Sequence, residues 1–319
     1  MLKAQVRVGI TMGDPAGIGA EIILKSLPHL KGLAEITVIG DNGVFSRLGG
    51  DALITKAARL VDLKNVRRQG FSFGKLKAAH GRSSMEYLEC ALSLICSKEI
   101  DCLVTAPISK EAINKAGFKF PGHTEYFADC VGAPHTVMML LNRYLKFSLV
   151  TRHVSLRNVA GLLNEKELMR VIRITFGALK NQFGVKEPRI AVCGLNPHAS
   201  DNGVIGKEEN AVIKPALRKL KFLKRHLIGP LASDIAIAGA YKKEYDAVIA
   251  MYHDQALIPL KLSDPYSGVN MTLGLPFIRT SPLHGTAFDI AGKNLARPQS
   301  MIEAVRLAAR CAGNIKHQR

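Results

Sequence analysis

The sequence predicts an α/β protein built on a mainly parallel β-sheet with helices packed on both faces. Two observations support this prediction. Short apolar segments with the length of buried strands alternate along the chain with longer amphipathic segments of helical periodicity. The chain of 319 residues is long enough for two domains or one large sheet, and its 47% hydrophobic and 22% charged residues are typical of a globular protein.

The first elements along the chain are a strand, a glycine-rich loop and a helix. Residues 6–11 form a short apolar run that predicts the strand, residues 13–19 carry three glycines, and residues 20–27 show a helical pattern. The alternation continues with a strand at 36–40, a helix at 85–98 and a strand at 102–105.

The middle of the chain departs from this alternation. Two strand-like segments, 136–141 and 147–151, are separated by a polar turn at Asn142 and Arg143, which predicts a β-hairpin and a change of architecture. The remaining predicted elements are a helix at 165–183, a strand at 190–195, a helix at 208–223, a strand at 247–251 and a terminal helix at 299–312.

The net charge of +18 raises the question of a nucleic-acid partner. Lys and Arg are spread along the chain apart from short clusters such as residues 218–225, so we expect a solvated basic face that also attracts anionic substrates. Neither a nucleic-acid nor a membrane partner is expected. A nucleic-acid-binding protein is the alternative of a different class, and it would need a concentrated basic face.

The composition also predicts a cytoplasmic protein. The six cysteines form no C-x-x-C pair and most have apolar neighbours, as free thiols do in a reducing compartment. Charged residues interrupt the N-terminal segment where a signal peptide needs an apolar core. The apolar runs are far shorter than the roughly 20 residues that cross a bilayer, so no membrane segment is expected.

Polar motifs follow four of the predicted strands. They begin at Thr105, His153, Asn196 and His253, each soon after an apolar run. Ligands of open α/β sheets collect beyond the carboxyl ends of the strands. We therefore expect these four segments to meet at one edge of the sheet and to contribute to an active site.

Three of these motifs carry a histidine, namely His153, His198 and His253, at spacings of 45 and 55 residues that match no local metal motif. Three neutral imidazoles suit a catalytic divalent metal ion with open coordination positions. Asp254 and Gln255 stand beside His253 and are candidates to fix its tautomer. Each histidine taken alone is compatible with an ordinary loop residue, but their shared position after a strand favours the metal site.

Further residues indicate an anionic ligand. Lys261, Asn270 and Arg279 supply two cations and an amide for a phosphate or carboxylate, although surface cations are common in so basic a chain. The loop at 13–19 precedes a helix, where backbone N–H groups can bind phosphate. Its glycine spacing matches neither G-x-G-x-x-G nor a Walker sequence, so a structural turn at Asp14 is an equal alternative.

His123 and Thr124 offer an imidazole and a hydroxyl directly after Gly122. Thr124 is also able to cap a helix that begins near Glu125. On the local pattern alone, the capping role is favoured over a ligand contact.

Six ordered motifs run from the first predicted strand to the segment before the last helix. They are GITMGDPAGIGAE at 9–21, TAPISK at 105–110, GHTE at 122–125, LNPHA at 195–199, MYHDQ at 251–255 and GVNMTLGLPFIRT at 268–280. Together they closely resemble the 4-hydroxythreonine-4-phosphate dehydrogenase family.

The resemblance implies an NAD- or NADP-dependent oxidation of 4-phosphohydroxy-L-threonine. The 3-keto acid product would decarboxylate to 3-amino-2-oxopropyl phosphate, a step in pyridoxal 5′-phosphate biosynthesis. It also implies a divalent metal (Zn, Mg or Co) on His153, His198 and His253. No residue that contacts NAD carries over. The substrate contacts it implies are His123, Thr124, Lys261, Asn270 and Arg279.

The resemblance further implies a homodimer with the active site at the interface, where the partner subunit completes it. The implied fold is that of the isocitrate and isopropylmalate dehydrogenases, with two α/β/α domains flanking a cleft, and not a Rossmann fold. Residues 1–127 with 290–319 would form the first domain. Residues 128–289 would form the second, which carries the metal histidines and the dimer interface.

Some assignments stay open at this point. Asp234 or Asp254 could assist proton transfer, and spacing alone does not choose between them. The segment 200–204 beside His198 differs from the common family pattern, as do Ala20 and Ala256, and related enzymes act on threonate or erythronate 4-phosphate. A metal-dependent hydrolase would use the same histidines to activate water without NAD.

Overall fold

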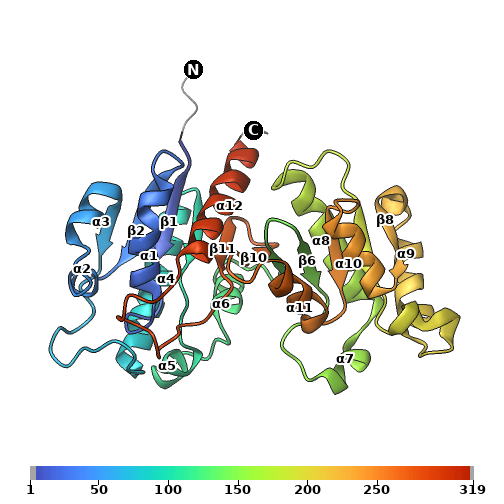
Figure 1. The fold of residues 1–319 in the computed structure, drawn as a ribbon, viewed down its shortest axis with the longest axis horizontal. Coiled ribbons are helices and arrows are strands. Elements are labelled where there is room, and N and C mark those ends of the chain that lie inside the picture. Colours follow the sequence, from blue (N-terminus) through green and yellow to red (C-terminus); the bar gives the residue numbers. More distant parts are fainter. Residues whose placement is uncertain (1–4, 317–319) are drawn as a thin grey trace. The chain divides into compact units, whose positions relative to one another are not determined.

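The computed structural model describes residues 5–316 and divides into two compact units (Figure 1). The first unit combines the chain up to residue 134 with the chain from residue 275 onward, and the second unit is residues 135–274. The predicted domain limits, 1–127 with 290–319 and 128–289, stay a prediction, because a compact unit is not by itself a domain that folds independently.

The first unit is built on five parallel strands in the order β3-β2-β1-β4-β11. Helix α4 packs on β1 and β2, and α12 packs on β4 and β11. Parallel strands buried on both faces are apolar throughout, so the sequence predicted β1, β2 and β4 to within one residue. The strands are β1 (Arg7–Thr11), β2 (Glu35–Gly40), β3 (Arg59–Asp62), β4 (Cys102–Thr105) and β11 (Ile278–Pro282).

The helices of the first unit lie between these strands in the chain, except α12, which follows the last strand. They are α1 (Gly19–Ser26), α2 (Asn42–Ser46), α3 (Asp51–Ala57), α4 (Ala78–Cys96), α5 (Lys110–Lys115), α6 (His123–Cys130) and α12 (Gln299–Lys316), with a 3₁₀ turn at Leu27–Leu30.

The second unit contains six strands in the order β10-β5-β6-β9-β7-β8. β5 pairs antiparallel with β10 and with β6, whereas β6, β9, β7 and β8 are parallel neighbours. The predicted hairpin is therefore confirmed. The strands are β5 (Val137–Leu141), β6 (Lys146–Leu149), β7 (Ile190–Cys193), β8 (Leu227–Leu231), β9 (Ala247–Ala250) and β10 (Val269–Leu273).

The long helix α8 of the second unit contacts β5, β6 and β10, and it buries Leu168, Val171 and Ile172. These apolar positions have helical spacing, which is why the sequence predicted the start of α8 correctly. The helices are α7 (Leu156–Leu162), α8 (Glu165–Asn181), α9 (Lys214–Lys219), α10 (Ser233–Tyr241) and α11 (His253–Ser263), with 3₁₀ or π turns at Pro197–Gly203, Glu209–Ile213 and Lys221–His226.

Two helix predictions were wrong in their limits. α4 begins at Ala78 and not near residue 85, because its first turns pack through small and polar residues; a Cβ on Gly81 would lie 2.1 Å from the carbonyl oxygen of Ala112. The helix expected at 208–223 is interrupted, since α9 ends where Leu220 leaves the helical conformation with ψ 44°.

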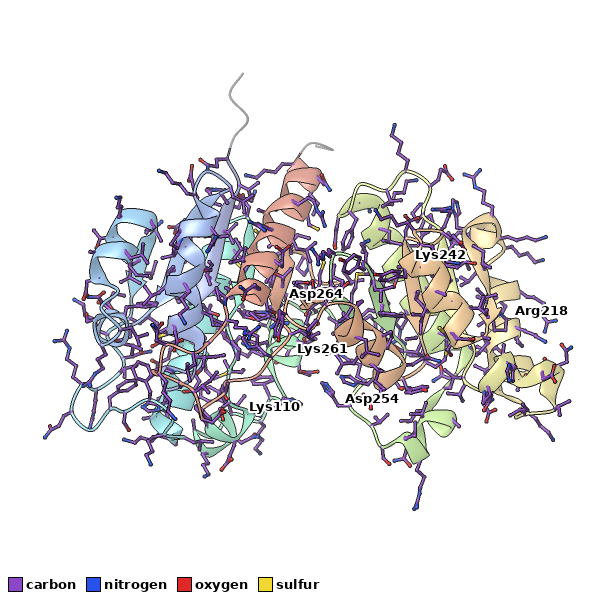
Figure 2. All side chains as sticks on the ribbon, in the orientation of Figure 1. Lys110, Arg218, Lys242, Asp254, Lys261 and Asp264 are labelled. Carbon is purple, nitrogen blue, oxygen red and sulfur yellow. The ribbon has the colours of Figure 1, made fainter. Side chains whose placement is uncertain are left out.

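All six cysteines are free, and Cys102, Cys193 and Cys311 are buried. None of the helices within residues 5–316 is both long and apolar enough to cross a membrane. Cations such as Arg218 on α9 and Lys242 just after α10 are exposed (Figure 2), in keeping with a basic surface in contact with solvent.

Candidate active site

The three predicted metal ligands follow neighbouring strands of the second unit. β6, β9 and β7 are adjacent and parallel, so their carboxyl ends lie at one edge of the sheet. His153 comes after β6, His253 after β9 as the first residue of α11, and His198 after β7. The sheet order thus places the three histidine segments at a common edge, and their binding to a metal stays a prediction.

His153 and His253 lie close together. Their ring centroids are 5.6 Å apart at an angle of 50°, and both rings line a hollow of about 250 Å³. The Nδ1 of His253 lies 2.7 Å from a carboxylate oxygen of Asp254. A neutral His253 ring would therefore carry its proton on Nδ1 and offer Nε2 as a ligand atom. Imidazole nitrogens of this kind are donors that a divalent metal ion accepts.

His198 lies on a left-handed segment. Residues 198–202 all have φ between +46° and +69°, although none of them is glycine, and this conformation costs roughly 1–2 kcal/mol per residue. Within residues 5–316, no three His, Cys, Asp or Glu side chains form a group that could hold a metal ion. The structure brings His153 and His253 together and does not bring His198 to them.

A π-helical turn that begins at Glu209 bonds the loop after β7 at two places, residues 195–196 and residue 202. The buried carboxylate of Glu209 accepts the N–H groups of Leu195 and Asn196, each at 2.8 Å. The side chain of Asn210 donates to the carbonyl oxygen of Asn202 at 3.0 Å. Burial acts to raise the pKa of Glu209, but the hydrogen bonds from Asn196 and Leu195 outweigh it and lower the pKa. Glu209 is therefore ionised at neutral pH and fixes the start of this loop.

Lys261 and Asn270 lie in the second unit on α11 and β10. The ammonium group of Lys261 donates to the carbonyl oxygen of Pro265 at 3.2 Å, and burial lowers its pKa against the attraction of Asp264. Figure 2 shows Lys261 and Asp254 towards opposite ends of α11. The Oδ1 of Asn270 is buried without a hydrogen-bond partner among the described residues, so a hydroxyl or amine of a ligand would satisfy it.

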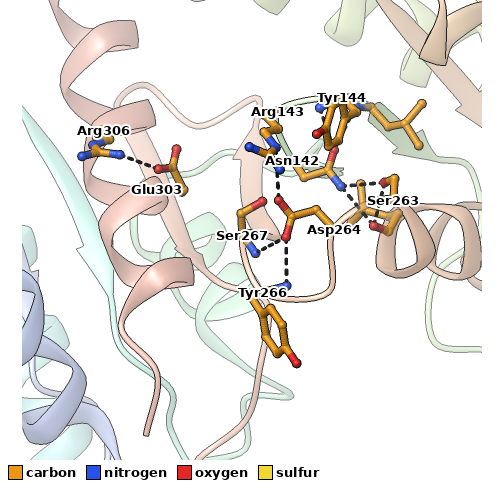
Figure 3. Close-up of polar contacts among 11 residues, drawn as sticks. Asn142, Arg143, Tyr144, Ser263, Asp264, Tyr266, Ser267, Glu303 and Arg306 are labelled. Carbon is orange, nitrogen blue, oxygen red and sulfur yellow. Dashed lines mark hydrogen bonds and ion pairs between the residues drawn. The ribbon is translucent and has the colours of Figure 1, made fainter.

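Asp264 directly follows α11 and orders the loop that leads to β10. Its carboxylate accepts the N–H groups of Tyr266 and Ser267 at 3.2 Å each and pairs with Arg143 at 3.3 Å (Figure 3). These hydrogen bonds hold the pKa of Asp264 below its ordinary value although burial acts to raise it. The loop between Lys261 and Asn270 is thus fixed by an ionised carboxylate.

Arg279 is a buried cation in β11 of the first unit. Its side chain is among the largest fully buried ones, and the residue is 2% exposed. Its guanidinium donates to the hydroxyl of Thr105, at the end of β4, over 2.5 Å. Burial lowers the pKa of Arg279 to about 10, against the attraction of Glu125. Arg279 is therefore charged at neutral pH, and a buried cation favours an anionic ligand.

His123 lies at the start of α6 in the same unit. Burial lowers the pKa of His123 well below its ordinary value, and the positive charges of Arg279 and Lys110 lower it further, although a backbone hydrogen bond with Ala106 opposes them. The ring is therefore neutral at pH 7. Its Nε2 is buried with no hydrogen-bond partner among the described residues, which suits contact with a polar ligand atom.

The capping role predicted for Thr124 is wrong. α6 begins at His123, with Gly122 at the N-cap, so Thr124 lies inside the first turn. With the extended backbone of Gly122 at the N-cap, the helix starts two residues earlier than the sequence indicated. Thr124 is 7% exposed, and its contact with a substrate stays a prediction.

The glycine loop at 13–19 packs tightly against the segment after β4. Gly13 has φ +72°, and a Cβ there would lie 2.3 Å from the carbonyl oxygen of Pro107. The carboxylate of Asp14 accepts the N–H of Ala16 at 2.9 Å and closes the turn. These contacts favour the structural turn over a phosphate loop.

Comparisons with known proteins decide the family. The family model described as "Pyridoxal phosphate biosynthetic protein PdxA" matches residues 28–308. The chain belongs to this family. A 4-hydroxythreonine-4-phosphate dehydrogenase from Sulfurihydrogenibium sp. is 42% identical over 315 residues, which cover 95% of this chain and 97% of the relative. The predicted resemblance is confirmed.

Two further relatives bear on the fold and the substrate. The crystal structure of a 4-hydroxythreonine-4-phosphate dehydrogenase from Klebsiella pneumoniae matches with a TM-score of 0.87 and 36% identity, over 98% of this chain and 100% of that chain. A D-threonate 4-phosphate dehydrogenase from Cupriavidus necator is 41% identical, over 96% of this chain and 97% of the relative. The predicted α/β fold is confirmed.

The two candidate catalytic acids of this PdxA-family chain differ in their contacts. Asp254 is bonded to His253, and its side chain is 66% exposed. Asp234 is exposed in the first turn of α10. Asp254 is therefore the better placed of the two to act on His253.

Sequence reasoning missed Glu209 and misjudged Gln255. An acidic side chain at the start of a predicted helix ordinarily faces solvent, where it interacts favourably with the helix dipole. No local pattern therefore marks Glu209 as buried. Gln255 was expected to act on the ring of His253. Its amide instead bonds the backbone of Met251 and Gly194, a contact across two strand ends that only sheet order reveals.

Proposed function

We propose that the chain is a metal-dependent dehydrogenase that oxidises 4-phosphohydroxy-L-threonine with NAD or NADP. The 3-keto acid product then loses CO₂ to give 3-amino-2-oxopropyl phosphate, in pyridoxal 5′-phosphate biosynthesis. The names of the relatives support the dehydrogenase class and the phosphorylated substrate.

The observation that carries this proposal is the arrangement of the histidine segments in the second unit. The ring centroids of His153 and His253 lie 5.6 Å apart. The carboxylate of Asp254 contacts Nδ1 of His253, so the Nε2 atom remains to bind a metal. We assign His198, which follows the next strand, as the third ligand. A bound divalent metal would lower the pKa of the reacting hydroxyl and stabilise the negative charge left by decarboxylation.

We assign the anionic and polar groups of the substrate to the polar side chains that the sequence singled out. Arg279 is charged and buried, so it favours a phosphate or carboxylate oxygen over neutral groups. His123 and Thr124 follow on α6 as neutral hydrogen-bonding partners. We assign Lys261 and the unsatisfied Oδ1 of Asn270 to the remaining polar groups.

Oxidation of the hydroxyl needs an acceptor for its proton. Asp254, or else Asp234, takes this role in the proposal, because both are exposed carboxylates. The hydride would go to the nicotinamide cofactor, and no residue of the chain is assigned to that cofactor.

We further propose a homodimer in which the partner subunit completes the site. Apolar side chains are exposed on two helices of the second unit, namely Ile235 and Tyr241 on α10 and Ile258 and Leu262 on α11. Exposed apolar surface of this kind is typical of a contact with another protein. Ile258→Glu is expected to give a monomer of reduced activity, measured by sedimentation and turnover; a variant that stays dimeric contradicts this interface.

The second candidate is a dehydrogenase of threonate or erythronate 4-phosphate. The D-threonate 4-phosphate dehydrogenase of Cupriavidus necator is nearly as similar to this chain as the 4-hydroxythreonine-4-phosphate enzymes. These substrates carry a hydroxyl where 4-phosphohydroxy-L-threonine carries an amine, so the two candidates differ in one group near the reacting carbon.

The test is an assay of NADH absorbance with each of the three phosphorylated acids, repeated with NADP and after chelation. We expect turnover with 4-phosphohydroxy-L-threonine that chelation abolishes and added metal restores. Preference for a sugar acid phosphate would favour the second candidate. Absence of NADH with every substrate, together with no effect of chelation, would overturn the dehydrogenase; release of phosphate without NAD would favour a metal-dependent hydrolase.

A further inference from the structure

A buried amide, Gln255, connects three segments that end near the sheet edge of the second unit. The residue is 6% exposed and lies in the first turn of α11. Its Oε1 accepts the N–H of Met251 at 2.6 Å, and its Nε2 donates to the carbonyl oxygen of Gly194 at 2.8 Å and to the hydroxyl of Ser233 at 2.8 Å. One side chain thus bonds the ends of β9 and β7 and the start of α10.

These bonds use the amide in one orientation. The backbone N–H of Met251 can only donate and the carbonyl of Gly194 can only accept, so Oε1 and Nε2 cannot exchange places without losing both bonds. Because the amide is buried, an unmade bond would cost the full desolvation of the polar group. Gln255 therefore fixes the spacing between the two strand ends and does not merely fill space.

The third strand end is bonded to the same residue, Met251. Thr151 lies just after β6. Its N–H and its hydroxyl both donate hydrogen bonds to the carbonyl oxygen of Met251, at 3.1 and 2.7 Å. The Met251 residue is thus held by Thr151 through its C=O and by Gln255 through its N–H. A continuous chain of hydrogen bonds runs from β6 through β9 to β7.

Each of the segments linked in this way carries a candidate site residue. Thr151 precedes His153 by two residues, Met251 precedes His253 by two, and Gly194 precedes His198 by four. We propose that Gln255 is a positioning residue that sets the separation of the three histidine segments and thereby the geometry of the metal site. This inference rests on the proposed role of the histidines as metal ligands.

The test measures binding of Co²⁺ alone to the full-length chain, by titration of its visible absorption, in the native protein and in Gln255→Met. Methionine has a similar length and removes all three hydrogen bonds. Because partners that orient metal ligands typically contribute a factor of 10–100 to affinity, we expect the Kd for Co²⁺ to rise about 10- to 100-fold and the cobalt spectrum to change shape.

Asn142→Leu is the matched control. Asn142 is a buried amide of the same unit, 8% exposed, whose Oδ1 accepts the N–H groups of Tyr144 and Leu145. Its Nδ2 bonds the carbonyl oxygen of Leu260 and the hydroxyl of Ser263, at the far end of α11 from His253 (Figure 3). We expect this variant to lose thermal stability as Gln255→Met does, with the cobalt affinity and spectrum unchanged.

A milder variant keeps the test decisive if Gln255→Met does not fold. Thr151→Val retains the shape of the side chain and removes the hydroxyl that bonds Met251. Loss of a single hydrogen bond predicts a Kd for Co²⁺ raised about fivefold. An unchanged Kd in this variant counts against the proposal.

The outcomes separate the two proposals. If the native protein binds Co²⁺ and Gln255→Met binds it with the same Kd and spectrum, the positioning role is wrong while the metal site stands. Equal weakening in Gln255→Met and Asn142→Leu would likewise overturn the positioning role, since general destabilisation would explain both. If the native protein binds no Co²⁺, the metal site itself is wrong and the positioning role falls with it.

Discussion

The two units treat their polar candidate residues in different ways. In the first unit Arg279 and the Nε2 of His123 are buried, and burial shifts the pKa values of both side chains downward. In the second unit His153 and His198 are exposed. Buried side chains at the starts of helical segments, such as Glu209 and Gln255, bond the backbone of the loops that carry the histidines. The comparison shows that burial keeps the His123 ring of the first unit neutral, whereas hydrogen bonds to loop backbone fix the segments that carry the histidines of the second unit.

The largest effect is expected from removal of a proposed ligand of the second unit. His253→Ala should lower metal-dependent turnover by at least about 1000-fold, because loss of a partner that only orients a ligand already costs 10–100-fold. Bound metal and kcat/KM are the measurements. His198→Ala is the companion variant, and retention of full metal and full turnover in it would remove His198 from the ligand set.

The buried cation of the first unit gives the next effect. Arg279→Met should lower kcat/KM roughly 300-fold, since truncation of a buried charged group that binds its partner costs about 2–5 kcal/mol. The melting temperature should stay the same or rise, because the variant no longer buries a charge. A loss of stability that parallels the loss of turnover would mean that Arg279 supports the fold and not the ligand.

Burial in the first unit also predicts a pH dependence of stability through Asp14. Burial raises the pKa of Asp14 to about 6, against a hydrogen bond from Ala16, and its Oδ2 has no hydrogen-bond partner among the described residues. The folded state then binds the proton more tightly than the unfolded state, whose pKa is near 3.8. This contribution to stability is fully present below pH 3.8 and is lost as the pH rises through about 6.

Asp14→Asn should therefore stabilise the chain by about 3 kcal/mol at pH 8 and change little at pH 4. Urea unfolding at the two pH values measures the difference. Asp289→Asn, at an exposed position of the same unit, is the control and should show no such pH dependence. A variant less stable than the native chain at pH 8 would contradict the sign.

The smallest effect concerns the carboxylate of Asp254, which contacts the ring of His253. Asp254→Asn keeps an oxygen that can accept from Nδ1 and removes the charge, so we expect metal affinity to fall about tenfold. Asp234→Asn should leave metal affinity unchanged and lower turnover only if Asp234 moves the proton. Equal metal affinity in the native chain and in Asp254→Asn would show that exposed contacts in the second unit do not tune the ligand.

The sequence alone predicted several strands, the family and the candidate site residues of this protein. Apolar runs predicted β1, β2, β4 and β9 almost to the residue, because parallel strands buried on both faces leave a strong local signal. The polar motifs after the strands, and the ordered set of six motifs, predicted the family and selected the residues that the proposed function uses.

Only the tertiary structure shows the strand order and the burial of individual side chains. Strand order, which depends on contacts between distant residues, showed that the three histidine segments follow adjacent strands. Burial, which also depends on the whole fold, showed that Arg279 is enclosed and that Glu209 fixes a loop. Gln255 unites both points, because an amide in a helix has a positioning role only once the strand ends that it bonds are known to be neighbours.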